Sequence, residues 1–189
     1  MIPKLRFNSF SNEWDNKTLG DIGEVRMCKR VFNSETNQSG GIPFYKIGTF
    51  GKSADAFINE RLYRVYREKY KFPKKGEILI SASGTLGRRV RYNGEDAYYQ
   101  DSNIVWIEND EELVTNDFLY YLYEIVRYDS EGGTIQRLYN SIIKRAKIGL
   151  PSFAEQNKIT LLLNSIDQRI LLLNKKKEAL ETYKNGLIQ

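Results

Sequence analysis

The last quarter of the chain carries its most regular pattern of apolar residues. Within residues 150–189 one apolar side chain recurs at every seventh position. This row consists of Ile159, Ile166, Leu173, Leu180 and Leu187. A seven-residue repeat keeps one side of a helix turned toward a partner helix, because it holds the apolar seam in register along both helices. The pattern therefore predicts one long amphipathic helix that is built for helix pairing.

A second set of apolar residues widens the seam, and it consists of Leu162, Leu163, Ile170 and Tyr183. Pro151 followed by Ser152 is typical of a helix start. From residue 153 to residue 185 the helix would measure about 50 Å at 1.5 Å per residue, more than a compact domain of this size covers. The alternative is a final helix lying across its own domain. The pairing helix is favoured over it, since the repeat outlasts an average helix of about 11 residues.

Short apolar segments alternate with helical patterns in the rest of the chain. Extended strands are predicted at residues 24–27, 42–47, 77–80, 88–92, 103–107 and 146–150. Asn59 is expected to cap a helix that reaches Tyr70. Thr115 or Asn116 is expected to cap a second helix that reaches about Arg127. Residues 1–13 show no periodic spacing of apolar and polar side chains, which indicates an N-terminal arm. The mixed order predicts an α+β fold: a globular mixed α/β domain over residues 1–150, followed by a long coiled-coil helix over residues 151–189.

Composition narrows the classes of function. The 189 residues carry a net charge of +5 and include 13 tyrosines, which favours a polyanionic partner. The absence of histidine removes His-based acid/base chemistry and most metal sites, so we expect no metal and no cofactor in this chain. The lone Cys28 fits a reducing cytoplasm. Since no apolar run approaches the about 18 residues of a membrane span, we expect a soluble cytoplasmic protein without a membrane partner.

The strongest local chemical signal is the segment 81–87 (SASGTLG), which lies between an apolar strand and a basic one. Its glycines let the backbone approach a ligand, and its hydroxyls offer donors to phosphate oxygens. Strand alternation places Arg89 and Arg91 on one face and Arg88 on the other. The segment is not a phosphate-binding P-loop, because the Lys-Ser/Thr ending is absent. A tight turn with solvated arginines remains an equal alternative.

Segments 98–103 and 134–137 add tyrosines, amides and hydroxyls suited to base edges, and we expect them on the same surface. Taken alone, each segment is more typical of an ordinary polar turn. The candidate DNA-binding residues are Lys46, Ser81, Ser83, Gly84, Thr85, Arg88, Arg89, Arg91, Tyr98, Gln100, Ser102, Asn103, Thr134, Gln136 and Arg137. Asp96 and Asp101 lack the Glu-x-Lys partner of a metal-dependent nuclease. The cofactor loop and the Asn-Pro-Pro-Tyr segment of an adenine methyltransferase are also missing. We therefore predict a non-catalytic chain.

The order of several motifs resembles a known family. Trp14 is followed by the segments 17–22 (KTLGDI), 75–81 (KGEILIS), 84–87 (GTLG), 100–103 (QDSN), 133–138 (GTIQRL), 148–151 (IGLP), 155–159 (EQNKI) and 184–189 (KNGLIQ). In this order and spacing they are similar to a specificity subunit of type I restriction-modification systems, over nearly the whole chain. The resemblance implies a target-recognition domain followed by the conserved helix of that family.

The resemblance also implies a function and partners. Such subunits are non-catalytic readers of double-stranded DNA that direct methyltransferase (modification) and restriction subunits to a two-part target. They usually carry two recognition domains joined by two antiparallel helices, whereas this sequence holds one of each. We therefore expect a half-length subunit, a truncated form or an excised half that pairs with itself or with another half through the helix. Two heads about 50 Å apart would bracket more than one DNA turn of about 34 Å.

Two other hypotheses are kept. One is a coiled-coil scaffold whose basic head binds protein and reads no DNA sequence. The other is a stand-alone nuclease, which the missing metal triad disfavours. The family's base-reading residues vary between members, so the candidate positions above rest on side-chain chemistry alone.

Overall fold

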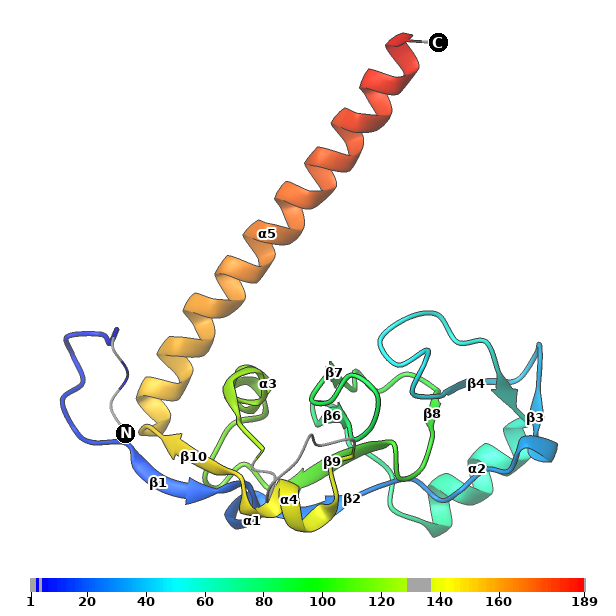
Figure 1. The fold of residues 1–189 in the computed structure, drawn as a ribbon, viewed down its shortest axis with the longest axis horizontal. Coiled ribbons are helices and arrows are strands. Elements are labelled where there is room, and N and C mark those ends of the chain that lie inside the picture. The colour runs from blue at the N-terminus through cyan, green and yellow to red at the C-terminus, as the bar shows by residue number, and fades with distance from the viewer. Residues whose placement is uncertain (1–2, 4, 129–136, 189) are drawn as a thin grey trace.

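The structure is a computed structural model that describes residues 3, 5–128 and 137–188. Residues 5–128 and 137–150 form an elongated head, and the helix α5 (Phe153–Ile188) leaves one end of it and rises away (Figure 1). The predicted α+β architecture with a long C-terminal helix is confirmed. The division into domains at residue 150 stays a prediction. Within the described residues, no helix combines the length and the apolar character needed to span a membrane.

A four-stranded antiparallel sheet forms the centre of the head. Its strand order is β2 (Gly23–Arg26), β9 (Ile104–Asn109), β6 (Ile78–Ser81) and β7 (Arg89–Arg91). Neighbouring side chains of β6 enter different cores: Ile78 and Ile80 pack into one cluster, and Leu79 packs into another. This follows from the two-residue period of a strand. The sheet is therefore buried on both faces.

The first core lies between the sheet and three helices. These are α1 (Leu19–Ile22), α3 (Asn116–Ile125) and α4 (Asn140–Arg145). Asp21 accepts a hydrogen bond from the Thr18 backbone N–H at 2.7 Å, as in a capping box at the start of α1. Thr115 caps α3, as predicted, through its bond to the Phe118 N–H. α4 begins at Asn140, with Tyr139 in the N-cap position.

The second core is aromatic and is covered by a smaller sheet and α2 (Glu60–Lys69). This sheet has the order β3 (Thr36–Asn37), β5 (Phe57–Ile58), β4 (Ile42–Tyr45) and β8 (Tyr98–Tyr99), with β4 and β8 parallel. Asn59 caps α2 as predicted. The segment 31–41 contains the short helix η1 (Asn33–Glu35) and β3.

A third, two-stranded sheet ties the N-terminus to the start of α5. Strand β1 (Asp15–Thr18) pairs antiparallel with β10 (Lys147–Leu150), and the pattern of polar residues gave no sign of β1. Trp14, which follows the N-terminal arm, packs edge-on against Phe118 of α3. The arm before it lies beside the base of α5 (Figure 1).

α5 contains 36 residues and, at 1.5 Å per residue, is about 54 Å long. Its first turns pack on the head, and residues 165–188 are all exposed. The expectation of a helix that extends beyond its own domain is confirmed. One predicted seam residue is corrected, because Ile159 packs against the first core of its own head.

Candidate nucleic-acid interface

The turn after β6 is built by its own polar groups. The Ser81 hydroxyl donates to the Thr85 carbonyl oxygen and accepts from the Arg88 N–H at 2.8 Å. Gly84 and Gly87 have φ angles of +65° and +73°, a left-handed conformation that favours glycine. Ser81 is buried, and both of its hydrogen-bonding capacities are used inside the turn. The prediction that Ser81 contacts DNA is therefore wrong, whereas Gly84 and Thr85 stand exposed at the tip.

Three segments that are distant in sequence meet beside this tip. The Ser83 hydroxyl donates to Asn103 Oδ1 at 2.9 Å, and an isolated β-bridge joins Ser83 to Arg137. Arg137 in turn donates to the Ser102 carbonyl oxygen at 2.9 Å. The expectation that these segments share one surface is confirmed for these residues. Thr134 and Gln136, which were predicted with them, lie outside the described residues.

A fourth segment, residues 46–52, borders the same surface. Gln100 Oε1 accepts the Ile47 N–H at 3.0 Å, so the side chain of Gln100 holds this loop against the 100–103 segment. Arg88 donates to the Phe50 carbonyl oxygen at 2.9 Å from the other side. Lys46 forms an ion pair of 2.9 Å with Asp55, and both side chains are largely exposed. Exposed pairs of this kind contribute little stability, so a phosphate can replace the carboxylate.

Tyr98 does not offer a stacking face. It is 1 % exposed, its ring lies among the aromatic residues of the second core, and its hydroxyl donates to the Lys29 carbonyl oxygen at 3.0 Å. Burial raises the pKa of Tyr98 far above its ordinary value. The prediction that Tyr98 binds DNA is wrong, because the strand β8 turns this side chain into the protein.

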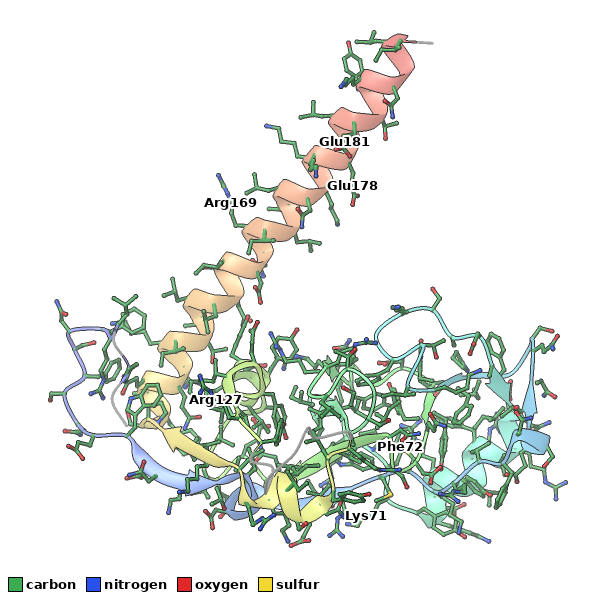
Figure 2. All side chains as sticks on the ribbon, in the orientation of Figure 1. Lys71, Phe72, Arg127, Arg169, Glu178 and Glu181 are labelled. Atoms are coloured by element: carbon green, nitrogen blue, oxygen red, sulfur yellow. The ribbon has the colours of Figure 1, made fainter. Side chains whose placement is uncertain are left out.

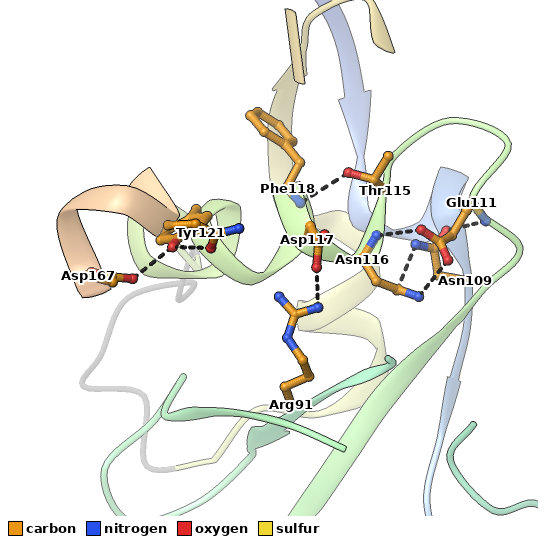
Figure 3. Close-up of polar contacts among 10 residues, drawn as sticks. Arg91, Asn109, Glu111, Thr115, Asn116, Asp117, Phe118, Tyr121 and Asp167 are labelled. Atoms are coloured by element: carbon orange, nitrogen blue, oxygen red, sulfur yellow. Dashed lines mark hydrogen bonds and ion pairs between the residues drawn. The ribbon is translucent and has the colours of Figure 1, made fainter. Parts of the chain in front are cut away.

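Arg89 and Arg91 lie on one face of β7, as strand alternation predicted, but that face is covered by α3. Arg89 pairs with Glu124 at 2.6 Å, and Arg91 pairs with Asp117 (Figure 3). Both guanidinium groups also lie over the ring of Tyr120, at 4.5 and 5.5 Å from its centre. The expectation of an open cationic strand face is corrected: these two arginines hold α3 on the sheet.

Two cations that the sequence analysis missed lie at the edges of the surface. Lys52 is exposed in the loop 46–52. Arg30, whose side chain is 60 % exposed, pairs with Asp101 at 2.9 Å, next to Ser102. No periodic or spacing signal marks either residue. Arg30 reaches the 100–103 segment only in the fold, through its pair with Asp101, and Lys52 lies in the loop that Gln100 holds at Ile47. Together with Arg137 and Lys46 they give the surface a cationic border, as phosphate contact requires.

Metal-dependent catalysis needs a cluster of ligands, and nucleophilic catalysis by cysteine needs a thiolate. The described part of the chain holds no group of three or more His, Cys, Asp or Glu residues able to bind a metal ion. Cys28 is buried, and burial raises its pKa to about 12, so the thiolate that a nucleophile needs is scarce at neutral pH. What the surface offers is hydrogen-bond donors, acceptors and positive charge, which suit binding.

The head also fixes the direction of α5. The buried amide of Gln156 accepts the Thr115 N–H at 3.0 Å and donates to the carbonyl oxygens of Leu113 and Pro151. About two turns further along α5, Asn164 Oδ1 and Asp167 Oδ2 each lie 2.7 Å from the hydroxyl oxygen of Tyr121 on α3 (Figure 3). Burial, together with Asp167, raises the pKa of Tyr121 above its ordinary value. These bonds make the base of α5 part of the head.

Beyond that base the predicted seam lies open. Relative exposure is 44 % at Ile166, 54 % at Leu173 and 69 % at Leu187. The other exposed members are Leu162, Ile170, Leu180 and Tyr183, and Leu163 is half-buried. Arg169, Glu178 and Glu181 stand on the same outer stretch (Figure 2). A row of large apolar side chains this long is typical of an interaction surface.

The comparisons with known proteins agree with this arrangement. A family described as the type I restriction modification DNA specificity domain matches residues 11–182. A Haemophilus influenzae protein named as a type I restriction enzyme specificity subunit is 57 % identical over 150 residues, which are 79 % of this chain and 39 % of the relative. The MjaIX specificity subunit of Methanocaldococcus jannaschii is 28 % identical over 93 % of this chain and 44 % of its own length.

Solved structures show the same fold. A chain from a structure of complex assembly in the type I R-M system has a TM-score of 0.70 at 18 % identity, over 94 % of this chain and 44 % of its own. The HsdS subunit of Thermoanaerobacter tengcongensis has a TM-score of 0.62 at 19 % identity, over 88 % of this chain and 40 % of its own. The chain thus spans less than half the length of the relatives that it matches. The match over residues 11–182 shows that the chain belongs to the family of type I restriction modification DNA specificity domains.

Proposed function

We propose that this chain is a DNA reader that recognises one half of a two-part target and brings methyltransferase and restriction subunits to it. The observation that carries the proposal is the meeting of the turn 82–85, the segment 100–103 and Arg137 on one surface. Amides and hydroxyls there match base edges, and the cationic border matches phosphates. The chain itself supplies no catalytic step and holds no cofactor in this proposal, and it acts in the cytoplasm.

Pairing through α5 belongs to the same proposal. One head reads a few base pairs, so a two-part target requires a second head at a fixed distance. A second copy of the chain, or another half-length subunit, supplies that head when it pairs along the exposed seam. The bonds from Gln156 and Tyr121 support this role, because they couple the direction of α5 to the reading surface.

The test is a selection of bound sequences from a random duplex library, with the chain assembled on its methyltransferase subunits. We expect enrichment of a short half-site, present twice in inverted orientation at a constant spacing if the chain pairs with itself. Enrichment of no half-site, with the partner subunits present, would favour the coiled-coil scaffold instead. Magnesium-dependent cleavage by the highly purified chain alone would favour the nuclease.

A further inference from the structure

We propose that the reading surface, where the turn 82–85 meets the segment 100–103, selects guanine in the major groove through the N–H groups of Gln100, Asn103 and Arg137. The inference rests on the DNA reading in the proposed function and deepens it. It names the base that the head selects, the atoms that select it and the residue that orients one of the two amides.

The amide oxygens of this surface are already used inside the protein. Gln100 Oε1 accepts the Ile47 N–H at 3.0 Å, and Asn103 Oδ1 accepts the Ser83 hydroxyl at 2.9 Å. Both side chains are half-buried, and among the described residues neither amide nitrogen has a hydrogen-bond acceptor. Each nitrogen therefore keeps two N–H donors for a ligand, whereas each oxygen is turned toward the protein.

Two further acceptors of the segment 100–103 are occupied in the same way. The carboxylate of Asp101 is 14 % exposed, pairs with Arg30 at 2.9 Å and accepts the Ser102 hydroxyl at 3.2 Å. The Ser102 carbonyl oxygen accepts one N–H of Arg137 at 2.9 Å. A guanidinium group has five N–H donors and no acceptor, so Arg137 keeps donors to spare. The surface is thus rich in donors, and its acceptors are satisfied from within.

The backbone that carries these groups is held in an uncommon conformation. Ser102 has a φ angle of +61°, in the left-handed region that serine rarely adopts. Such a conformation persists where the surrounding structure enforces it, and it is concentrated at functional sites. Here the bond from Arg137 to Ser102 and a backbone bond of 2.7 Å from the Ala82 N–H to the Asn103 carbonyl oxygen enforce it. The donors are therefore positioned before DNA arrives.

Guanine is the base whose edge matches paired donors. In the major groove it presents two acceptors, N7 and O6, whereas adenine and thymine present one each and cytosine presents a donor. An amide that reads adenine must also accept from the adenine N6 amino group with its oxygen. That oxygen is turned to Ser83 in Asn103 and to Ile47 in Gln100. The surface therefore favours guanine over the other three bases.

The breadth of the surface favours the major groove. Three segments lie against one another, because the Ala82 N–H donates to the Asn103 carbonyl oxygen and the Leu138 N–H donates to the Ala82 carbonyl oxygen at 2.8 Å. Bonded segments lie about 4.8 Å apart, so three of them are broader than the about 6 Å of the minor groove. The major groove, about 12 Å wide, admits such a surface. Donors in the minor groove would select A·T pairs instead, so the two grooves predict different bases.

The amide of Asn103 is tested by repeating the half-site selection with Asn103→Asp, assembled on the methyltransferase subunits. The carboxylate still accepts from Ser83, but it replaces the free N–H groups by an acceptor. Guanine at one position of the half-site should fall about tenfold or more, and cytosine should gain, since a carboxylate accepts from cytosine N4. Asn16→Asp, at an exposed position of β1, brings the same charge and is the matched control. It should keep the wild-type half-site.

Ser83 is tested as the residue that positions this amide. Without its hydroxyl, in Ser83→Ala, the amide of Asn103 is free to turn its oxygen outward. Adenine should then rise toward guanine at the position that Asn103→Asp identifies, and Ser83→Thr, which keeps a hydroxyl, should restore the preference for guanine. An equal loss of binding to all sequences, with the base preference unchanged, would show a structural role only and would overturn the orienting role of Ser83.

A base analogue tests the groove and the atom. 7-Deazaguanine has a C–H group in place of N7, a major-groove atom, and keeps its Watson–Crick pairing. Replacing the guanine at that position should weaken wild-type binding about tenfold and should leave the binding of Asn103→Asp unchanged, as measured by fluorescence anisotropy.

The outcomes separate this inference from the proposed function. A wild-type half-site without guanine, a preference for A·T pairs at the contacted positions, or equal wild-type affinity for guanine and 7-deazaguanine would overturn the reading of guanine, although DNA reading would stand. A wild-type chain that selects no half-site, with its partner subunits present, would overturn both.

Discussion

The inner and outer turns of α5 carry the same seven-residue row but differ in what covers them. In the inner turns, polar side chains are buried: Glu155, Gln156 and Thr160 are each at most 4 % exposed, while the apolar Ile159 beside them is half-buried. In the outer turns, residues 165–188 are exposed whether they are leucines or lysines. Hydrogen bonds therefore fasten the inner turns to the head, whereas the outer turns extend away from it (Figure 1).

The difference shows what a heptad alone conveys. The row predicts which side of the helix seeks a partner, but the partner at Ile159 is the chain's own head, and at Leu173 it is absent from the single chain. Specific hydrogen bonds at the base set the direction of the rod. Further out, large apolar side chains lie exposed along the helix, which is typical of an interaction surface. The following predictions separate these two roles.

The largest effect is expected for Leu173→Asp combined with Leu180→Asp. Both charges would lie in the paired seam, where burial without a partner is costly, so pairing or partner assembly should be lost while the head stays folded. Light scattering gives the mass, and circular dichroism checks the head. Leu171→Asp should keep the wild-type mass. An unchanged mass for the double variant would contradict the seam.

Gln156→Ala should destabilise the inner turns. It leaves the Thr115 N–H and two carbonyl groups without their partner, which should lower the free energy of unfolding by about 2 to 3 kcal/mol. Chemical denaturation measures the change. Gln168→Ala, on the exposed stretch of the same helix, is the control and should change stability little. A similar small change for both would mean that the amide does not fasten α5.

The ion pair at the base predicts a dependence on pH. Hydrogen bonds from Arg6 lower the pKa of Glu155 below its ordinary value of 4.5. The pKa of Glu155 is lower in the folded chain than in the unfolded chain. The stabilisation is therefore complete above the unfolded-state pKa and is lost as the pH falls through the folded-state pKa. Glu155→Gln should make the free energy of unfolding less dependent on pH in this acid range. The exposed Glu178→Gln is the control, and a profile that Glu155→Gln leaves unaltered would contradict the prediction.

The smallest effect concerns DNA. If the head carries the phosphate contacts, Lys52→Ala should lower affinity modestly and reduce the slope of binding against salt by about one. Lys176→Ala, on the outer turns, should leave that slope unchanged, because the proposed function assigns this stretch to helix pairing and not to DNA. Fluorescence anisotropy on the selected half-site measures both. Equal slopes for wild type and Lys52→Ala would remove Lys52 from the interface.

The sequence alone determined the elements whose signals are local. The seam and the start of α5, the caps Asn59 and Thr115, and the strand β6 depend on residues a few positions apart, so periodicity and cap chemistry reveal them. The family was also recognisable, because the order of its motifs survives in the chain.

The tertiary structure decided which of these faces reach solvent. Tyr98 is buried and Arg91 is paired with α3 because segments distant in sequence cover them, and neither contact leaves a period in the chain. The strand β1 likewise exists only where residues about 130 or more positions apart meet. Local conformation follows from near neighbours, whereas burial and pairing follow from long-range packing, which a single sequence pattern does not encode.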